Sequence, residues 1–145
     1  MSAESEGGTP LDATLDTSAR SISRRSMSAI TAGDRDGWLA LFADDAIVED
    51  PIGPSFFDET GEGHRGKEAI ALFYDTAIAP NRHIEFLIRE SYECANECAN
   101  VGTIRITLST GQVSSVDGVY CYRVGQDGLL RSLRAFWEMD SITFT

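Results

Sequence analysis

Residues 33–53 read GDRDGWLALFADDAIVEDPIG, and this stretch decides the fold. Gly33 is suited to end a helix, because glycine readily adopts the left-handed conformation found just past a helix C-terminus. Asp34 can cap the short second helix that follows. The apolar run after that helix predicts a strand, which Pro51 ends because proline has no N–H to donate to a sheet. The carboxylate of Asp50 therefore stands at the end of a strand.

The remaining pattern predicts helices in the first half of the chain and strands in the second. Apolar residues recur near helical spacing over residues 15–32 and 67–78. Residues 53–66 contain glycine, proline and acidic residues without a period, which indicates a loop. Alternating runs separated by turn residues predict four further strands, at residues 83–94, 101–109, 113–124 and 129–137. These elements predict an α+β domain with its helices on one face of an antiparallel sheet.

The composition argues against nucleic-acid and membrane partners. The 145 residues carry a formal net charge of −11, which repels phosphate backbones and anionic membrane surfaces. No apolar stretch approaches the roughly 18 residues that a membrane span needs. Residues 1–16 lack a basic segment followed by an apolar run, so they are not expected to be a signal peptide. We expect a flexible tail at residues 1–16, a single domain at residues 17–145 and a cytoplasmic location.

The cysteines do not form a recognisable metal motif. The chain has three of them, and an odd count without an export signal favours reduced thiols. Cys94 and Cys98 lack the CxxC spacing of zinc sites, and the whole chain has two histidines. We therefore expect neither a metal nor an organic cofactor.

Three segments resemble the ketosteroid isomerase family. In that family the same helix–helix–strand order as in residues 33–53 runs into a V-E-D-P-hydrophobic-G stretch. Residues 64–74, HRGKEAIALFY, resemble its third helix, and residues 128–140, GLLRSLRAFWEMD, resemble its last strand. The resemblance implies the SnoaL-like branch of the nuclear-transport-factor-2-like superfamily. It further implies a cone-shaped fold, in which three N-terminal helices pack on a strongly curved, mostly antiparallel sheet that encloses an apolar pocket.

The resemblance also implies a steroid Δ-isomerase that moves a proton on an apolar molecule bearing a carbonyl. Asp50 stands where the family has its general base, and Trp137 stands at a pocket position of the last strand. An independent reason favours Asp50, because a carboxylate at a strand end can project into a cavity where desolvation raises its pKa. The alternative is that Asp50 only caps the turn that begins at Pro51.

The chain departs from the family at both donors of its oxyanion hole. Ser26 stands where the family has a tyrosine on the first helix, and serine is too short to replace it. Tyr120 stands where the family has a protonated aspartate, and a phenol can still donate to a carbonyl. Tyr74 matches a supporting tyrosine on the third helix. These departures leave open a protein that binds a small molecule without catalysis, in which both tyrosines are core residues.

Glu85 supports a second enzymatic hypothesis, an epoxide hydrolase or cyclase. Alternation in residues 83–88 puts His83, Glu85 and Leu87 on one face, and the family match makes this the pocket face. Epoxide-opening members of the superfamily pair the aspartate with a glutamate on this strand. The alternative is a solvated glutamate. The residues expected to bind the ligand are Ser26, Phe42, His83, Thr103, Arg105 and Trp137.

The strand at residues 101–108 also alternates, and the family match assigns its faces. Thr103 and Arg105 are expected to line the pocket. Ile104, Ile106 and Leu108 would then lie outside it, and an exposed apolar sheet face needs a partner. We therefore expect a homodimer through that face. A shift of one residue in register would exchange the two faces.

Overall fold

The computed structural model describes residues 16–145. The predicted tail therefore lies, apart from Asp16, outside the described residues. The helices are α1 (Ala19–Ala32), α2 (Arg35–Leu39), α3 (Lys67–Phe73), the π-helix η1 (Tyr74–Ile78) and the 3₁₀ helix η2 (Met139–Ser141). The strands are β1 (Phe42–Glu49), β2 (His64–Arg65), β3 (His83–Cys94), β4 (Glu97–Thr107), β5 (Val113–Val124), β6 (Leu130–Phe136) and β7 (Thr143–Phe144).

One sheet runs through the molecule in the order β2-β1-β6-β5-β4-β3, and β7 pairs with β5. The β1–β6 pair is parallel and the other pairs are antiparallel, so the sheet is mixed. The predicted α+β class is confirmed. Two short strands, β2 and β7, were not expected from the sequence. The strong curvature expected of the sheet stays a prediction.

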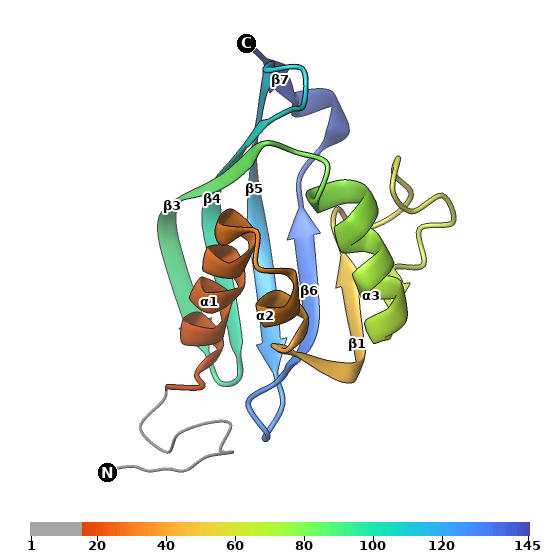
Figure 1. Cartoon of the computed structure of the whole chain (residues 1–145). Helices are drawn as coiled ribbons and strands as arrows, with labels where there is room; N and C mark the ends of the chain where they lie inside the picture. Colours follow the sequence, from red (N-terminus) through yellow and green to blue (C-terminus); the bar gives the residue numbers. More distant parts are fainter. Residues whose placement is uncertain (1–15) are drawn as a thin grey trace.

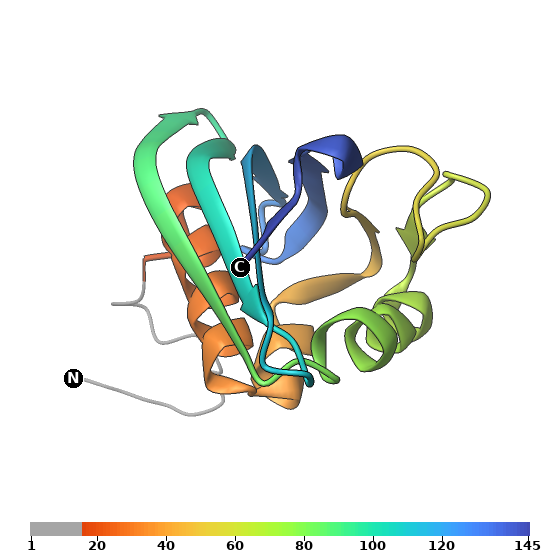
Figure 2. The same cartoon turned by 90° about the horizontal axis from the view of Figure 1, so that it is seen from above.

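The helices lie on one side of the sheet, as the predicted class requires (Figures 1 and 2). Helix α1 packs on β3, β4 and β5, whereas α3 packs on β1 and β2. The two caps predicted between α1 and α2 are confirmed. Gly33 has φ of 69° and closes α1, and the Asp34 carboxylate accepts from Gly37 N–H at 3.0 Å to start α2. These caps turn the chain so that Trp38 enters the core.

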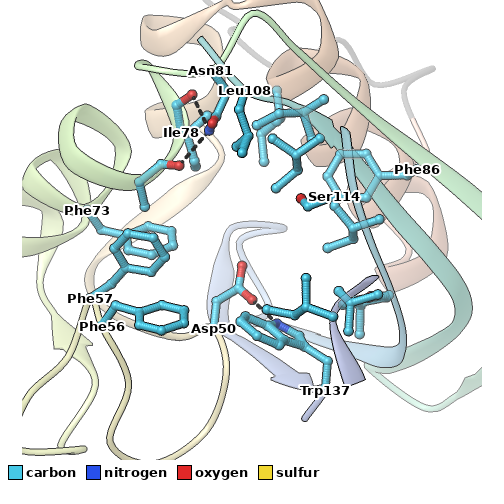
Figure 3. Close-up of a pocket in the computed structure, with 18 of the residues that line it drawn as sticks. Asp50, Phe56, Phe57, Phe73, Ile78, Asn81, Phe86, Leu108, Ser114 and Trp137 are labelled. Carbon is cyan, nitrogen blue, oxygen red and sulfur yellow. Dashed lines mark hydrogen bonds between the residues drawn. The ribbon is translucent and has the colours of Figure 1, made fainter. Parts of the chain in front are cut away.

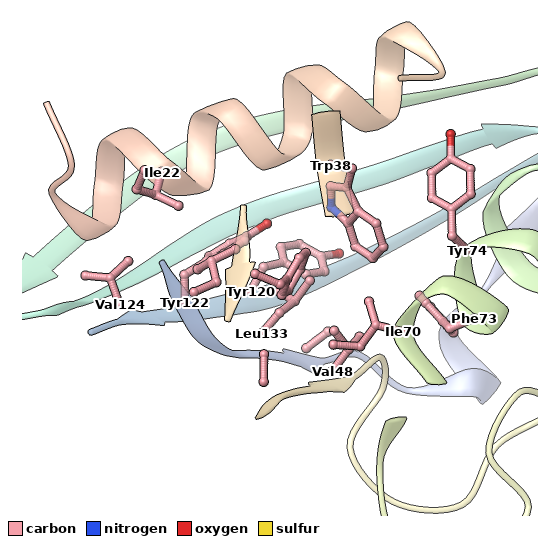
Figure 4. Close-up of a cluster of buried hydrophobic side chains, with 14 of the residues drawn as sticks. Ile22, Trp38, Val48, Ile70, Phe73, Tyr74, Tyr120, Tyr122, Val124 and Leu133 are labelled. Carbon is pink, nitrogen blue, oxygen red and sulfur yellow. The ribbon is translucent and has the colours of Figure 1, made fainter. Parts of the chain in front are cut away.

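Trp38 is the centre of the core beneath α1 (Figure 4). Its ring is fully buried and meets Phe42 edge-on at 4.8 Å between centroids. The indole Nε1 donates to Ser26 Oγ at 3.0 Å, so the one polar atom of the ring is satisfied. Phe42, which we expected to bind the ligand, instead packs in this core, because β1 turns it toward Trp38.

The pocket face and the outer face of β3 and β4 were predicted the wrong way round. Ile84 pairs with Ile106, and Phe86 pairs with Ile104, on the side of the sheet that bears α1. Ile104, Ile106 and Leu108 line an internal cavity. The homodimer interface predicted from these three side chains is therefore wrong. The oligomeric state itself stays a prediction.

Candidate active site

A cavity of about 320 Å³ lies between the inner face of the sheet, the π-helix η1 and the segment that follows β1. This volume is within the ~300–1,000 Å³ range of small-molecule sites. Its wall is mostly aliphatic and aromatic, and Asp50 is the one carboxylate among the described residues that line it (Figure 3). The other lining residues are Ile30, Phe56, Phe57, Phe73, Ala77, Ile78, Asn81, Ile84, Phe86, Ile104, Ile106, Leu108, Ser114, Val116, Tyr120, Tyr122, Leu133, Trp137, Ile142 and Phe144.

Asp50 enters this cavity because it follows the last residue of β1. The next residues are held beside β6, where Ile52 N–H donates to the Ala135 carbonyl at 3.0 Å. Trp137 Nε1 donates to Asp50 Oδ1 at 2.6 Å, which leaves the second carboxylate oxygen available (Figure 3). Burial raises the pKa of Asp50, whereas the Trp137 hydrogen bond and the charge of His64 oppose the rise. A carboxylate held in this way is a stronger base than one in water.

Tyr120 lines the same cavity from the middle of β5. Its hydroxyl is buried and has no hydrogen-bond partner among the described residues 16–145. Gly118 makes room for it, because an added Cβ there would lie 3.1 Å from Tyr120 Oη and 3.0 Å from Trp137 Cβ. Burial, and then the charge of Asp50, raise the pKa of Tyr120. The phenol therefore keeps its proton and has no protein acceptor for it.

Tyr122 is a second phenol on the cavity wall, and the sequence analysis did not single it out. It is 3% exposed and follows Tyr120 by two positions, so both side chains leave the same face of β5. Burial, and then the charge of Asp50, raise the pKa of Tyr122, whereas a hydrogen bond with Ser26 opposes the rise. The Tyr-Cys-Tyr alternation of residues 120–122 is the signal that could have revealed it.

Ser26 and Tyr74, two further predicted site residues, are buried next to Trp38 rather than on the cavity wall. Ser26 is fully buried on α1 and accepts from the indole of Trp38. Tyr74 begins the π-helix, and its ring lies 5.5 Å from Trp38 between centroids. In Figure 4 its hydroxyl points away from Tyr120 and Tyr122. Tyr74 thus packs in the core and does not line the cavity that contains Asp50.

Four more predicted site residues lie on the outer face of the sheet or at its edge. Glu85 pairs with Arg105 across β3 and β4 at 3.1 Å, with both side chains partly in solvent. Thr103 accepts from Arg89 Nη1 and donates to Asp117. His83 is exposed at the start of β3. Because the two faces are exchanged relative to the prediction, all four side chains lie away from Asp50. The pairing of Asp50 with Glu85 across one pocket is therefore wrong.

Aromatic residues close the cavity on the side opposite the sheet. Phe57 meets Phe56 at 5.8 Å and Phe73 at 6.2 Å between centroids, both edge-on. Phe56 and Phe57 belong to the predicted loop and are 71% and 40% exposed. The sequence signal for them is an aromatic pair in a loop with no strand or helix to bury it. These side chains give an apolar ligand a surface on which to pack.

Comparison with known proteins places the chain in one family. Residues 23–133 match the SnoaL-like domain family. The chain belongs to this family. A steroid Δ-isomerase of Nocardioides simplex is 29% identical to this SnoaL-like protein over 122 residues, which cover 83% of this chain and 90% of the relative.

Two solved structures of relatives resemble this SnoaL-like protein over almost their full length. A Δ5-3-ketosteroid isomerase of a Mycobacterium species is 41% identical, with a TM-score of 0.84 over 90% of this chain and 100% of that chain. The protein RV0760c of Mycobacterium tuberculosis, solved in complex with estradiol-17β-hemisuccinate, is 40% identical. Its TM-score is 0.82, over 87% of this chain and 98% of that chain. The structural neighbours are thus ketosteroid isomerase-like members of the nuclear-transport-factor-2-like superfamily.

The geometry of the SnoaL-like site permits proton transfer in a desolvated, apolar cavity. One carboxylate, Asp50, can accept and return a proton, and two phenols, Tyr120 and Tyr122, can donate hydrogen bonds. Within residues 16–145 no group of three or more His, Cys, Asp or Glu side chains could hold a metal ion. Over the same residues no helix is long and apolar enough to cross a membrane.

Proposed function

We propose that this protein is a steroid Δ-isomerase that needs no cofactor, with Asp50 as its general base. One observation carries the proposal, namely that Asp50 lines one apolar cavity with the phenol of Tyr120, which has no hydrogen-bond partner in the described part of the chain. The homology to steroid Δ-isomerases supports the reaction, and the estradiol ester bound to RV0760c supports a steroid as the ligand. The substrate would be a 3-ketosteroid with a double bond one carbon removed from conjugation.

Asp50 would move one proton between two carbons of this substrate. Its free carboxylate oxygen removes the proton from the carbon between the carbonyl and the double bond. The electron pair moves toward the carbonyl oxygen and forms a dienolate. Asp50 then returns the proton to the far end of the diene, which leaves a conjugated enone and the original carboxylate. The raised pKa of Asp50 favours this exchange, because the base then holds the proton more readily.

Tyr120 would stabilise the negative charge that develops on the substrate oxygen. Its proton has no protein acceptor among residues 16–145, and its pKa is raised, so the phenol can donate without losing its proton. A donor already in place needs no reorganisation when the charge appears, and one such donor is worth about 10²–10³ in turnover. The aliphatic wall excludes water, which strengthens the interaction.

The test is turnover of a β,γ-unsaturated 3-ketosteroid, followed by the ultraviolet absorbance of the conjugated enone. The proposal expects saturable turnover by the purified parent protein and none of an epoxide analogue. Turnover of the epoxide alone would contradict it. If neither compound reacts, yet steroids raise the melting temperature of the protein, the chain is a binding protein with the shape of an isomerase.

A further inference from the structure

The cavity has a second polar end, away from Asp50, that the proposed reaction does not use. Asn81 and Ser114 line this end, whereas most of the remaining wall is aliphatic or aromatic (Figure 3). Asn81 is held there because the next residue, Arg82, donates its N–H to the Thr107 carbonyl at 2.8 Å, at the end of β4. Thr107 in turn pairs with the residue that precedes Ser114 on β5. Two separate segments therefore bring one amide and one hydroxyl to the same end of the cavity.

Asn81 offers a ligand one polar atom, its amide oxygen. The amide nitrogen donates to the carbonyls of Ala77 at 2.8 Å and Ile78 at 3.1 Å, at the end of η1. These two bonds fix the orientation of the amide, because only its nitrogen carries protons. Within residues 16–145 no group donates to the amide oxygen. That oxygen can only accept, so it selects a ligand group that can donate.

Ser114 offers a hydroxyl, which can donate as well as accept. Its side chain leaves the same face of β5 as Tyr120, an even number of positions away. Figure 3 shows the Ser114 oxygen directed into the cavity. The backbone of Ser114 pairs with Ile106 of β4 and Phe144 of β7, and within residues 16–145 its hydroxyl makes no hydrogen bond. The fold therefore leaves this hydroxyl available to a ligand.

The spacing of the two polar ends is that of a fused four-ring skeleton. A Cβ added to Gly118 would lie 3.1 Å from Tyr120 Oη and 3.0 Å from Trp137 Cβ, so the reacting end of the cavity lies at the level of Gly118. Ser114 lies four residues earlier on the same strand, which is about 13 Å at ~3.3 Å per residue. A 3-ketosteroid whose carbonyl accepts from Tyr120 therefore directs carbon 17, at its opposite end, toward Ser114 and Asn81.

We propose that Asn81 and Ser114 form a hydroxyl-binding subsite, so that the substrate is a 3-ketosteroid with a hydroxyl group at carbon 17. This inference rests on the proposed function, because the carbonyl at the Tyr120 end sets the direction in which the steroid lies. The hydroxyl donates to the Asn81 amide oxygen and accepts from the Ser114 hydroxyl. A ketone at the same carbon accepts from Ser114 but places a second acceptor against the Asn81 oxygen. The subsite therefore prefers a hydroxyl to a ketone.

The experiment compares the dissociation constants of three conjugated 3-ketosteroids that differ only at carbon 17. Testosterone carries a hydroxyl there, androstenedione carries a ketone, and 17-deoxytestosterone carries no oxygen. We expect the parent protein to bind testosterone about 3- to 10-fold more tightly than androstenedione, the usual effect of one hydrogen bond.

Two substitutions separate the two residues. Asn81→Leu should abolish the preference for testosterone over androstenedione, because the acceptor is lost. Ser114→Ala should keep that preference and weaken the binding of both compounds about 3- to 10-fold relative to 17-deoxytestosterone. Ser115→Ala makes the same change on the outer face of β5, so this matched control should leave all three affinities unchanged. Thermal denaturation verifies that each variant is folded, and the parent and Ser114→Ala test the subsite if Asn81→Leu does not fold.

Equal affinities of the parent for testosterone and androstenedione would overturn the inference, and so would a parent that binds none of the three steroids. A preference that persists in folded Asn81→Leu would overturn the role of Asn81, and unchanged affinities in Ser114→Ala would overturn that of Ser114. These measurements do not depend on turnover. If the preference is found but the parent does not isomerise the ketosteroid, the proposed function fails and the subsite stands. If the parent isomerises it and shows no preference, the subsite fails alone.

Discussion

Replacing Tyr120 with phenylalanine should raise stability and lower activity at the same time. The Tyr120 hydroxyl is buried without a hydrogen-bond partner among residues 16–145. A polar group buried in this way costs about 1–3 kcal/mol of folding free energy. Phenylalanine removes that cost and keeps the ring, which is 2% exposed and packs in the core. For a domain of this size each kcal/mol shifts the melting temperature by about 3–5 °C.

The expected result for Tyr120→Phe is therefore a melting temperature higher by about 3–15 °C. Turnover of the ketosteroid should fall about 10²–10³-fold, because one oxyanion donor is lost. The matched control is Tyr92→Phe, which removes a hydroxyl from a side chain that is 57% exposed. That variant should keep the stability and the turnover of the parent, because its hydroxyl is not buried.

Thermal denaturation and steady-state turnover on the same preparations measure both effects. A Tyr120→Phe protein that is less stable than the parent and equally active would refute the reasoning. Its hydroxyl would then be a structural group, and the donor role would be lost. A variant that gains stability but keeps full activity would contradict the donor role alone.

Three further substitutions test the site. Asp50→Asn should raise the melting temperature at neutral pH. Burial raises the pKa of Asp50 in the folded protein above its value in the unfolded chain. The stability that Asp50 contributes is therefore present below the unfolded pKa and is lost as pH rises through the folded pKa. The gain should vanish near pH 3, below the unfolded pKa of about 3.9, and a gain that persists there would contradict the argument. Glu85→Gln breaks only the partly solvated ion pair with Arg105 and should leave turnover unchanged. A large loss of turnover would instead support the hypothesis that Glu85 is a catalytic acid. Gly118→Ala should lower stability by about 1–3 kcal/mol, because its Cβ would lie 2.6 Å from the Phe136 carbonyl oxygen, and should displace Tyr120, whose Oη would lie 3.1 Å from that Cβ. A variant as stable as the parent would show that this space is not tight.

The local elements were predictable because each has a strong local signal. Gly33 and Asp34 end one helix and start the next with their own backbone and side chain, so no distant contact is needed. Alternation likewise placed β3, β4 and β5 within a few residues. Strands β2 and β7 have two residues each, too few for a period, and they form only because β1 and β5 offer edges for pairing.

The faces of the strands were not predictable from alternation, because a period of two reveals two faces and not which one is covered. The family match assigned the wrong face of β3 and β4 to the pocket. Physical chemistry favours the observed one: Glu85 and Arg105 are opposite charges directly across two strands, a pair that stays in solvent. Ile84 and Ile104 suit a cavity whose contents are apolar. The same error placed four predicted site residues in the pocket that lie on the outer face or edge of the sheet, namely His83, Glu85, Thr103 and Arg105.

The most direct test of the account is the turnover of Asp50→Asn on a β,γ-unsaturated 3-ketosteroid, measured beside its affinity for estradiol-17β-hemisuccinate. Asparagine keeps the shape of the side chain and an oxygen for the Trp137 N–H, but it cannot take a proton from carbon. The account predicts a fall in turnover of about 10²–10⁴-fold, with binding of the estradiol ester retained. A variant that binds this steroid and isomerises the substrate as fast as the parent would contradict the role of Asp50 as the base.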